Sequence, residues 1–300
     1  MKLIVTGALQ ATAEELNTLA SLGFDVTLHP DERQKVVDPA QYDAAVCNGL
    51  FLHNDIAAFS NLKLIQLTSA GMDRAPVAYV NSHGIRLYNA AGVYSVPMAE
   101  WTVMRLLELS KNAAAGYENQ RNKLWSKDRG WKELSGSTAC IVGFGAYGQE
   151  TAKRLHAFGV DVTVVNRSGK ESPFVNRFYL LEQLDEALAD ADIVILAIAL
   201  TEQTRHLFGK PRFAVMKPGA LFLNAARGAL VDENALVDAL KTGRLAGAAL
   251  DVFETEPLPE ASPLWNCPNT LLSPHNSFVS PQNHHRLMTV VRKNLKNMER

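Results

Sequence analysis

Short hydrophobic runs alternate with longer segments of helical periodicity along most of the chain. In the first third, the predicted strands cover residues 2–6, 24–28, 44–48, 62–68 and 85–89. Residues 12–22 have the spacing of an amphipathic helix, with Leu16 and Leu19 among its apolar positions. Buried strands that alternate with helices are typical of a parallel sheet, so this segment is expected to form one α/β unit.

A second α/β series follows a long predicted helix over residues 97–116. Pro97 suits the first turn of that helix and Gly116 suits its end. The polar stretch 117–135 is rich in Arg, Lys and Trp and is expected to form a surface arm. Further predicted strands begin at residue 138 and cover 160–166, 191–198, 219–226, 245–253 and 269–275, before a final helix from about Pro281.

Length and composition fit a globular protein with two domains. The 300 residues are about twice the usual length of one domain. The hydrophobic share of 47% and the charged share of 20% exclude a disordered chain, a collagen-like repeat and a coiled coil. With 30 basic and 31 acidic residues the net charge is −1. The chain therefore lacks the overall basic field expected for binding nucleic acid or an acidic membrane surface.

The cysteines and the apolar segments indicate a cytoplasmic protein without a metal site. Cys47, Cys140 and Cys267 are scattered and form no CxxC pair, so neither a disulfide framework nor a zinc site is expected. The adjacent His284 and His285 are no metal site either, because neighbours on a helix point apart. The apolar opening segment is too short for a signal peptide, and no window approaches the ~18 apolar residues that indicate a membrane span.

A glycine motif indicates a dinucleotide site. Gly143, Gly145 and Gly148 form GxGxxG around Ala146 and Tyr147, between a strand ending in CIV and the helical segment QETAKRLHAFG. In this context the first glycine permits a tight turn, the second admits a pyrophosphate, and the third lets helix and strand pack closely. The phosphate then lies at the positive end of the helix. The alternative is a glycine-rich turn without a ligand.

The end of the following strand favours NADP(H), with NAD(H) as the second possibility. A dinucleotide fold selective for NAD carries Asp or Glu there, to bind the ribose 2′-hydroxyl. This chain instead has Asn166, Arg167 and Ser168, with Lys170 nearby. A guanidinium and a hydroxyl suit a 2′-phosphate. The alternative is an ordinary polar loop, because arginine is common in surface turns.

Three ionisable residues follow predicted strands of the second series, where open α/β sheets carry their active sites. Arg227, Glu256 and His275 lie in the segments NAARGALVDENALVDAL, GAALDVFETEPLP and SPHNS. Together with SAGMDRAP at 69–76 and the helix AEWTVMRLLELS, these segments resemble the NAD(P)-dependent D-2-hydroxyacid dehydrogenase family, which includes glyoxylate/hydroxypyruvate reductases. The resemblance extends over nearly the whole chain.

Each of these residues suits one task in reducing a 2-keto acid to a D-2-hydroxy acid. Hydride transfer to the carbonyl carbon leaves negative charge on the oxygen, and His275 is suited to protonate it near neutral pH. Glu256 beside the imidazole would favour its protonated form. Arg227 would hold the substrate carboxylate and stabilise the developing oxyanion.

The resemblance also implies further ligand contacts. In the loop Ser69–Met72, the main chain of Ala70 and Gly71 would bind the substrate carboxylate, although a plain turn is the alternative. Asp251 would accept a hydrogen bond from the nicotinamide amide, although it also suits a helix cap. The remaining expected cofactor contacts are Ala199, Thr204, Ala225, Ala226 and Arg227. Ala197 and Ala199 replace the His and Pro usual in the family, which affects how the cofactor's ribose is held.

The resemblance implies a fold of two doubly wound parallel-sheet domains. A flavodoxin-like substrate domain, residues 1–97 plus 278–300, would carry an inserted Rossmann domain, residues 98–277. It also implies a homodimer, with the long helix and the 117–135 arm at the interface. Trp125 and Trp131 fit that contact or a buried monomer core. Two other functions stay open: a dinucleotide-sensing corepressor and a formate-dehydrogenase-like enzyme.

Overall fold

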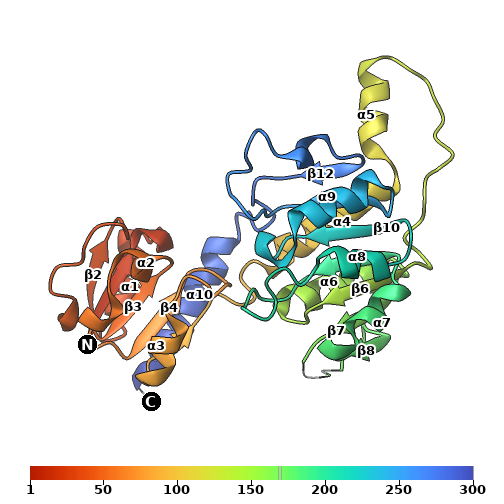
Figure 1. Cartoon of the computed structure of the whole chain (residues 1–300). Helices are drawn as coiled ribbons and strands as arrows, with labels where there is room; N and C mark the ends of the chain where they lie inside the picture. Colours follow the sequence, from red (N-terminus) through yellow and green to blue (C-terminus); the bar gives the residue numbers. More distant parts are fainter. Residues whose placement is uncertain (168, 170, 300) are drawn as a thin grey trace. The chain divides into compact units, whose positions relative to one another are not determined.

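The computed structural model describes residues 1–167, 169 and 171–299. The chain forms two compact units, one of Met1–Tyr94 with the segment from Ser280, the other of Ser95–Val279 (Figure 1). Residues 95–97 and 278–279, which the sequence assigned to the first unit, thus belong to the second. Residues 95–97 begin a helix that packs within the second unit, so the boundary lies before residue 95 and not after residue 97.

The first unit contains a parallel sheet with the strand order β2-β1-β3-β4-β5. Its strands are β1 (Lys2–Thr6), β2 (Asp25–His29), β3 (Ala44–Cys47), β4 (Leu64–Leu67) and β5 (Arg86–Tyr88). Its helices are α1 (Ala13–Ala20), α2 (Leu50–His53), α3 (Val77–Ser82) and α10 (Asn283–Lys296). Each strand lies within its predicted run or one residue beyond it, and β3, β4 and β5 are shorter than predicted.

Both faces of this sheet are buried. Along β1, Leu3 and Val5 pack in one hydrophobic cluster, whereas Ile4 packs in another on the opposite face. The C-terminal helix α10 contributes Val291 to the first cluster. The side-chain amide of Asn294 also donates to Oε1 of a buried glutamine of β4, 2.7 Å away. Helix α10 is therefore an integral part of the first unit, although it lies far from β1 in the sequence.

The second unit contains a parallel sheet with the order β12-β11-β10-β9-β6-β7-β8. Its strands are β6 (Thr138–Val142), β7 (Asp161–Val165), β8 (Arg177–Tyr179), β9 (Ile193–Leu196), β10 (Ala220–Asn224), β11 (Leu245–Leu250) and β12 (Thr270–Leu272). The order reverses between β6 and β9, which are neighbours. Because all strands are parallel, their carboxyl ends lie at one edge, where doubly wound sheets bind ligands.

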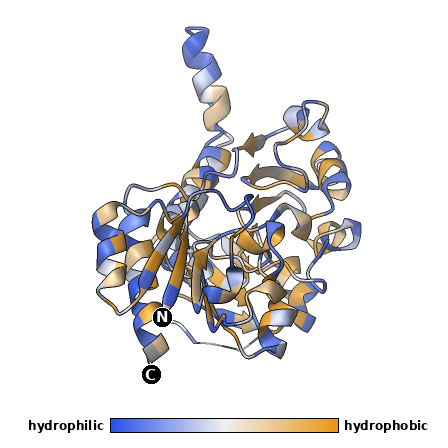
Figure 2. Cartoon of the chain, turned by 90° about the vertical axis from the view of Figure 1, so that its left-hand side faces the viewer, coloured by the Kyte–Doolittle hydropathy of each residue, from blue (hydrophilic) through white to orange (hydrophobic). Residues whose placement is uncertain are grey.

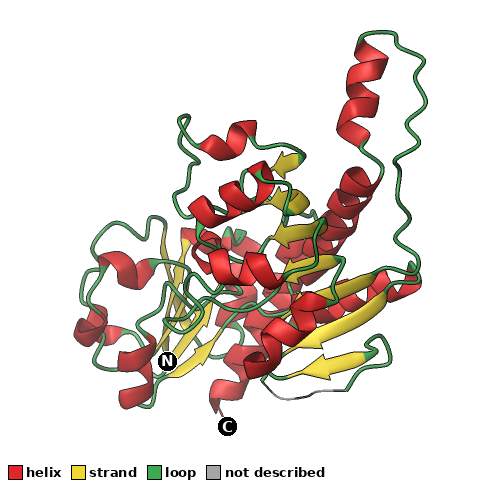
Figure 3. Ribbon diagram, turned by 45° about the vertical axis from the view of Figure 1, so that its right-hand side comes forward, coloured by secondary structure: helices red, strands yellow, loops and turns green. Residues whose placement is uncertain are grey.

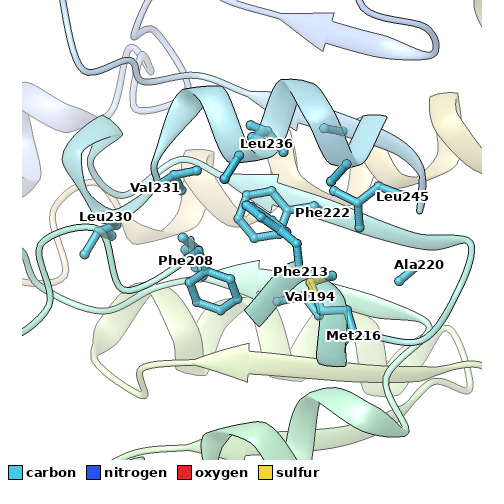
Figure 4. Packing of buried hydrophobic residues seen from close by; sticks show 14 of the residues in the cluster. Val194, Phe208, Phe213, Met216, Ala220, Phe222, Leu230, Val231, Leu236 and Leu245 are labelled. Atoms are coloured by element: carbon cyan, nitrogen blue, oxygen red, sulfur yellow. The ribbon is translucent and has the colours of Figure 1, made fainter. Parts of the chain in front are cut away.

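Helices cover both faces of this second sheet. They are α4 (Ser95–Ser110), α6 (Ala146–Ala157), α7 (Leu184–Ala189), α8 (Lys210–Val215) and α9 (Glu233–Lys241). Helices α4 and α6 pack on one face, and α7, α8 and α9 on the other. In the core beneath α9, the ring of Phe222 lies 5.4 Å from those of both Phe208 and Phe213, centroid to centroid (Figure 4). The expected α/β class with two parallel sheets is confirmed.

The prediction of one helix over residues 97–116 is wrong, because the segment forms two helices. Helix α4 begins at Ser95 and ends at Ser110, and α5 (Ala113–Arg121) follows. Asn112 between them has a φ of 46°, a left-handed conformation that asparagine tolerates better than most residues. Gly116 therefore lies inside α5 and does not end a helix.

Helix α5 and the chain that follows it form a projecting arm. The helix has no buried residue, and it leaves the second sheet with a long return loop (Figure 3). Its outer end is hydrophilic (Figure 2). Trp125 is 99% exposed and Trp131 is 57% exposed, so neither contributes to a core of this chain.

The sequence did not predict β8, a strand of three residues that pairs with β7 alone at the edge of the sheet. A run this short carries no readable periodicity. Among the described residues, no helix has the length and apolar character needed to cross a membrane.

Candidate active site

The glycine motif forms a tight turn between β6 and α6, and its three glycines have distinct surroundings. Gly143 has a φ of 105°, and a Cβ there would lie 2.4 Å from the Ala197 carbonyl oxygen. A Cβ at Gly148 would lie 2.4 Å from the carbonyl oxygen of Gly143. At Gly145, by contrast, a Cβ would meet no atom within 4 Å. Two glycines thus permit close packing, and the third leaves the approach to the helix open.

The N-terminus of α6 fits an anionic group such as a pyrophosphate. Gly145 is its N-cap residue, no side chain caps the helix, and the first turn contains no acidic residue. The N–H groups of Ala146 and Tyr147 are therefore left as donors at the positive end of the helix. The residues present fit a dinucleotide, because they combine an open glycine with main-chain donors that no side chain caps and a first turn without a carboxylate.

The end of β7 lies directly beside this turn. The N–H of Gly143 donates to the carbonyl oxygen of Val165, 2.8 Å away. The side-chain oxygen of Asn166 accepts from the N–H of Gly169 at 2.7 Å, which closes the following turn. Arg167 is exposed next to it, so its guanidinium is accessible to a ligand. Ser168, predicted as a cofactor contact, lies outside the described residues, as does Lys170.

The turn after β9 is shaped by Thr204. Its hydroxyl donates to the carbonyl oxygen of Ala199 at 2.8 Å and accepts from the N–H of Thr201 at 2.7 Å. Thr204 is buried, so its hydroxyl supports the loop from within. That Thr204 contacts the cofactor stays a prediction; within the chain its hydroxyl bonds the main chain of Ala199 and Thr201.

His275 and Glu256 are in direct contact. The imidazole Nδ1 lies 2.8 Å from Glu256 Oε2. The other carboxylate oxygen of Glu256 accepts from the N–H of Phe253 at 3.0 Å, which fixes the carboxylate. Within the described part of the chain, Nε2 of His275 has no hydrogen-bond partner. The glutamate therefore orients the ring through Nδ1, and a neutral or protonated imidazole can act on a ligand through its other nitrogen.

Arg227 lies on the neighbouring turn, after β10. The side chain of Asn224 shapes this turn, because its Nδ2 donates to the Arg227 carbonyl at 2.9 Å and its Oδ1 accepts from the N–H of Ala226 at 3.0 Å. Nη1 of Arg227 donates to the Ala226 carbonyl at 2.8 Å. A Cβ at Gly228 would lie 1.9 Å from the carbonyl carbon of Phe253. Only glycine lets the turn of Arg227 approach the turn that ends at Glu256 so closely.

The buried carboxylate of Asp251 holds the loop that carries His275. It accepts from the hydroxyl of Ser273 at 2.6 Å and from the N–H groups of Asn276 and Ser277 at 3.0 and 2.9 Å. A carboxylate has about four acceptor positions, and three of those of Asp251 are used inside the second unit, where its side chain is fully buried. The expected contact with the cofactor thus stays a prediction, and the structure adds a role for Asp251 in positioning His275.

Sequence reasoning missed this role of Asp251, and it missed Asn224 entirely. Both residues directly follow or end buried strands of the second sheet, next to predicted catalytic residues. A polar residue at that place is the signal that could have singled out Asn224. Ala225, by comparison, is buried beside Arg227, and Ala226 is partly buried.

In the first unit, the loop after β4 has donors available for an anion. The carbonyl of Thr68 accepts from the Tyr94 hydroxyl, that of Ala70 from the side-chain amide of Asn89, and that of Gly71 from the Ser69 hydroxyl. These bonds hold the carbonyl oxygens. The N–H groups of Ala70 and Gly71 donate to no acceptor among the residues that the structure describes, which fits a carboxylate-binding loop.

Comparison with known families matches residues 103–277 to "D-isomer specific 2-hydroxyacid dehydrogenase, NAD binding domain". The chain belongs to this family. It is 36% identical to a glyoxylate reductase of Thermofilum pendens over 248 residues, which cover 79% of this chain and 72% of the relative. It is 31% identical to glyoxylate/hydroxypyruvate reductase B of Citrobacter koseri over 284 residues, 91% of this chain and 87% of the relative.

A solved structure has the same architecture. The D-isomer specific 2-hydroxyacid dehydrogenase of Xanthobacter autotrophicus, in complex with NADPH and MES, superposes with a TM-score of 0.82. The two chains are 29% identical, and the match covers 99% of this chain and 94% of that one. The resemblance inferred from the sequence is therefore confirmed, and the protein is an oxidoreductase with a domain that binds a nicotinamide dinucleotide.

Proposed function

We propose that the protein reduces a small 2-keto acid to the D-2-hydroxy acid with NADPH, in a reversible hydride transfer. The observation that carries the proposal is the His275–Glu256 pair, 2.8 Å apart, at the sheet edge that also carries the glycine turn. Two relatives named as glyoxylate or glyoxylate/hydroxypyruvate reductases support small substrates of that class.

In this proposal, residues of the protein donate the proton and stabilise the negative charge that develops on the substrate. When bound, the dinucleotide supplies the hydride. Nε2 of His275 donates a proton to the carbonyl oxygen, and the carboxylate of Glu256 stabilises the imidazolium and fixes its ring. The guanidinium of Arg227 binds the substrate carboxylate and stabilises negative charge on the reacting oxygen.

The preference for NADP(H) rests on the end of β7. Position 166 carries asparagine, whereas an aspartate or glutamate there would repel a 2′-phosphate. The adjacent Arg167 is exposed. The related dehydrogenase from Xanthobacter autotrophicus was solved in complex with NADPH, which supports NADPH as the cofactor of this protein. NAD(H) is the alternative, and comparison of kcat/KM for the two reduced cofactors decides between them.

The test is turnover of the purified chain with a panel of 2-keto acids. Glyoxylate, hydroxypyruvate, pyruvate, a branched and an aromatic 2-keto acid are each incubated with NADPH and with NADH, and cofactor oxidation is followed by absorbance. Chiral chromatography of the product is expected to show the D-isomer. Absence of oxidation with every acid, while the dinucleotide still binds, would contradict the proposal and favour a dinucleotide sensor.

We also propose that the arm mediates a homodimer. The side chains of Tyr117, Leu124, Trp125 and Trp131 are each more than half exposed, and large exposed aromatic and apolar side chains mark interaction surfaces. Light scattering of the wild type is expected to give a dimer, and Trp125→Ala with Trp131→Ala is expected to shift it towards monomer. A wild-type monomer at all concentrations would contradict this assembly.

A further inference from the structure

We propose that Trp101 of helix α4 is a positioning residue for the reaction, acting through Ser273 and Asp251 on the loop that carries His275. This inference rests on the proposed function. Trp101 itself contacts neither His275 nor the glycine turn by any hydrogen bond of the described residues. It is therefore not a catalytic residue, and its effect must pass through its partners.

A buried chain of hydrogen bonds connects these residues. The indole Nε1 of Trp101 lies 3.2 Å from Ser273 Oγ, which lies 2.6 Å from Asp251 Oδ1. Their exposures are 7%, 7% and 0%. The direction is fixed by chemistry, because an indole N–H can only donate. The serine hydroxyl must therefore accept from Trp101 and give its single proton to Asp251.

Asp251, the last residue in this series of hydrogen bonds, holds the main chain on both sides of His275. Asp251 binds Ser273 on one side and the N–H groups of Asn276 and Ser277 on the other. Its main-chain carbonyl also accepts the N–H of His275 at 2.8 Å. His275 has a φ of 50°, a left-handed conformation that residues other than glycine adopt only where surrounding contacts enforce it.

Helix α4 also contacts the glycine turn through the next residue. The hydroxyl of Thr102 lies 2.7 Å from that of Tyr147, inside the motif GFGAYG. Burial raises the pKa of Tyr147 to about 12, so the phenol stays neutral and can share this bond. Two consecutive residues of one helix thus hold the loop of the proposed proton donor and the turn proposed to bind the cofactor.

The test uses Trp101→Phe, which removes the N–H donor and keeps an aromatic ring. We expect kcat for 2-keto acid reduction to fall about tenfold to a hundredfold, because small displacements of a reacting group have effects of this size. KM for NADPH should change less than threefold. The matched control is Trp265→Phe, which removes an indole N–H that donates to the Pro259 carbonyl at 3.0 Å on the surface, and its kcat should stay at the wild-type value.

Variants of Ser273 test the same series of hydrogen bonds independently. Ser273→Ala should lower kcat at least as far as Trp101→Phe, whereas Ser273→Thr keeps a hydroxyl and should restore most of the activity. Because both residues act through one chain, the double variant Trp101→Phe/Ser273→Ala should be no slower than Ser273→Ala alone. Multiplied losses in the double variant would overturn the inference.

Hydrogen exchange supplies a readout that does not depend on turnover. Exchange of the N–H groups of Asn276 and Ser277, followed by mass spectrometry of peptides over 272–279, should become faster in Trp101→Phe and stay unchanged in Trp265→Phe. If the wild type reduces 2-keto acids and Trp101→Phe keeps full kcat, the inference is wrong and the proposed function stands. If the wild type reduces none, the proposed function fails, and the role of Trp101 in catalysis fails with it.

Discussion

The substitution Asp251→Asn tests whether the buried carboxylate holds the loop of His275. One oxygen of Asp251 accepts from both Ser273 and Asn276, and the other accepts from the N–H of Ser277. An amide offers one oxygen and one NH₂ group. With its oxygen towards Ser273 and Asn276, its NH₂ faces the N–H of Ser277, so a buried donor loses its acceptor.

The magnitude follows from that lost bond. Leaving a buried donor without a partner, after loss of a bond to a charged group, costs about 2–3 kcal/mol. For a unit of this size each kcal/mol lowers Tm by about 2–4 °C, so we expect a decrease of about 4–12 °C. Differential scanning calorimetry of the chain without cofactor measures it.

The matched control is Asp232→Asn at the N-cap of α9. There one carboxylate oxygen accepts both hydrogen bonds, from the N–H groups of Asn234 and Ala235, and asparagine caps helices about as well as aspartate. Its Tm should change by less than about 2 °C. An unchanged Tm in Asp251→Asn, or equal losses in the two variants, would show that the Asp251 carboxylate does not hold the loop of His275.

Three further predictions concern the cofactor turn and stability against acid. Arg167→Ala should lower kcat/KM for NADPH about tenfold and leave that for NADH unchanged, because one charge-assisted hydrogen bond to the 2′-phosphate is lost; equal losses for both would contradict it. Gly145→Asp should abolish dinucleotide binding, measured by calorimetric titration, because the aspartate charge would repel the phosphates. Tm should be unchanged, because the position has room for a side chain. Retained affinity would contradict this prediction. Partial burial raises the pKa of Asp192, but hydrogen bonds from Lys217 and from the N–H of Thr138 lower it further, to below its ordinary value. This contribution is present above the unfolded pKa and is lost as pH falls through the folded pKa. Asp192→Asn should therefore lower Tm at pH ~7, with a loss of less than ~1 kcal/mol in unfolding free energy because the pair is partly exposed. The difference from the wild type should shrink as the pH is lowered below the ordinary pKa of aspartate.

Local signals were enough to predict the frame of the second unit. The glycine motif needs only its own turn, and the structure places all three glycines as the mechanism of that motif requires. Arg227, Glu256 and His275 were predicted at one sheet edge because parallel strands end on the same side. That rule identifies the edge, but the contact between Glu256 and His275 depends on side-chain geometry within it.

What the sequence could not reveal depends on tertiary contacts or on single dihedral angles. The helix break at Asn112 rests on one left-handed residue, while helical periodicity continues through the alanines that follow. The hydroxyl of Thr204 and the carboxylate of Asp251 are used inside the protein, and a sequence does not tell which way a polar side chain points. Trp101 and Ser273 are far apart in the sequence and meet only because α4 packs on one face of the second sheet.

In the proposed reaction, His275 exchanges the proton that accompanies hydride transfer to the 2-keto acid. The most direct measurement is the single-turnover rate of NADPH oxidation by glyoxylate in the wild type and in His275→Gln, with the Kd for NADPH measured in both. We predict a loss of at least about a hundredfold in rate and a change of less than threefold in Kd. A rate near the wild-type value in His275→Gln would contradict the account.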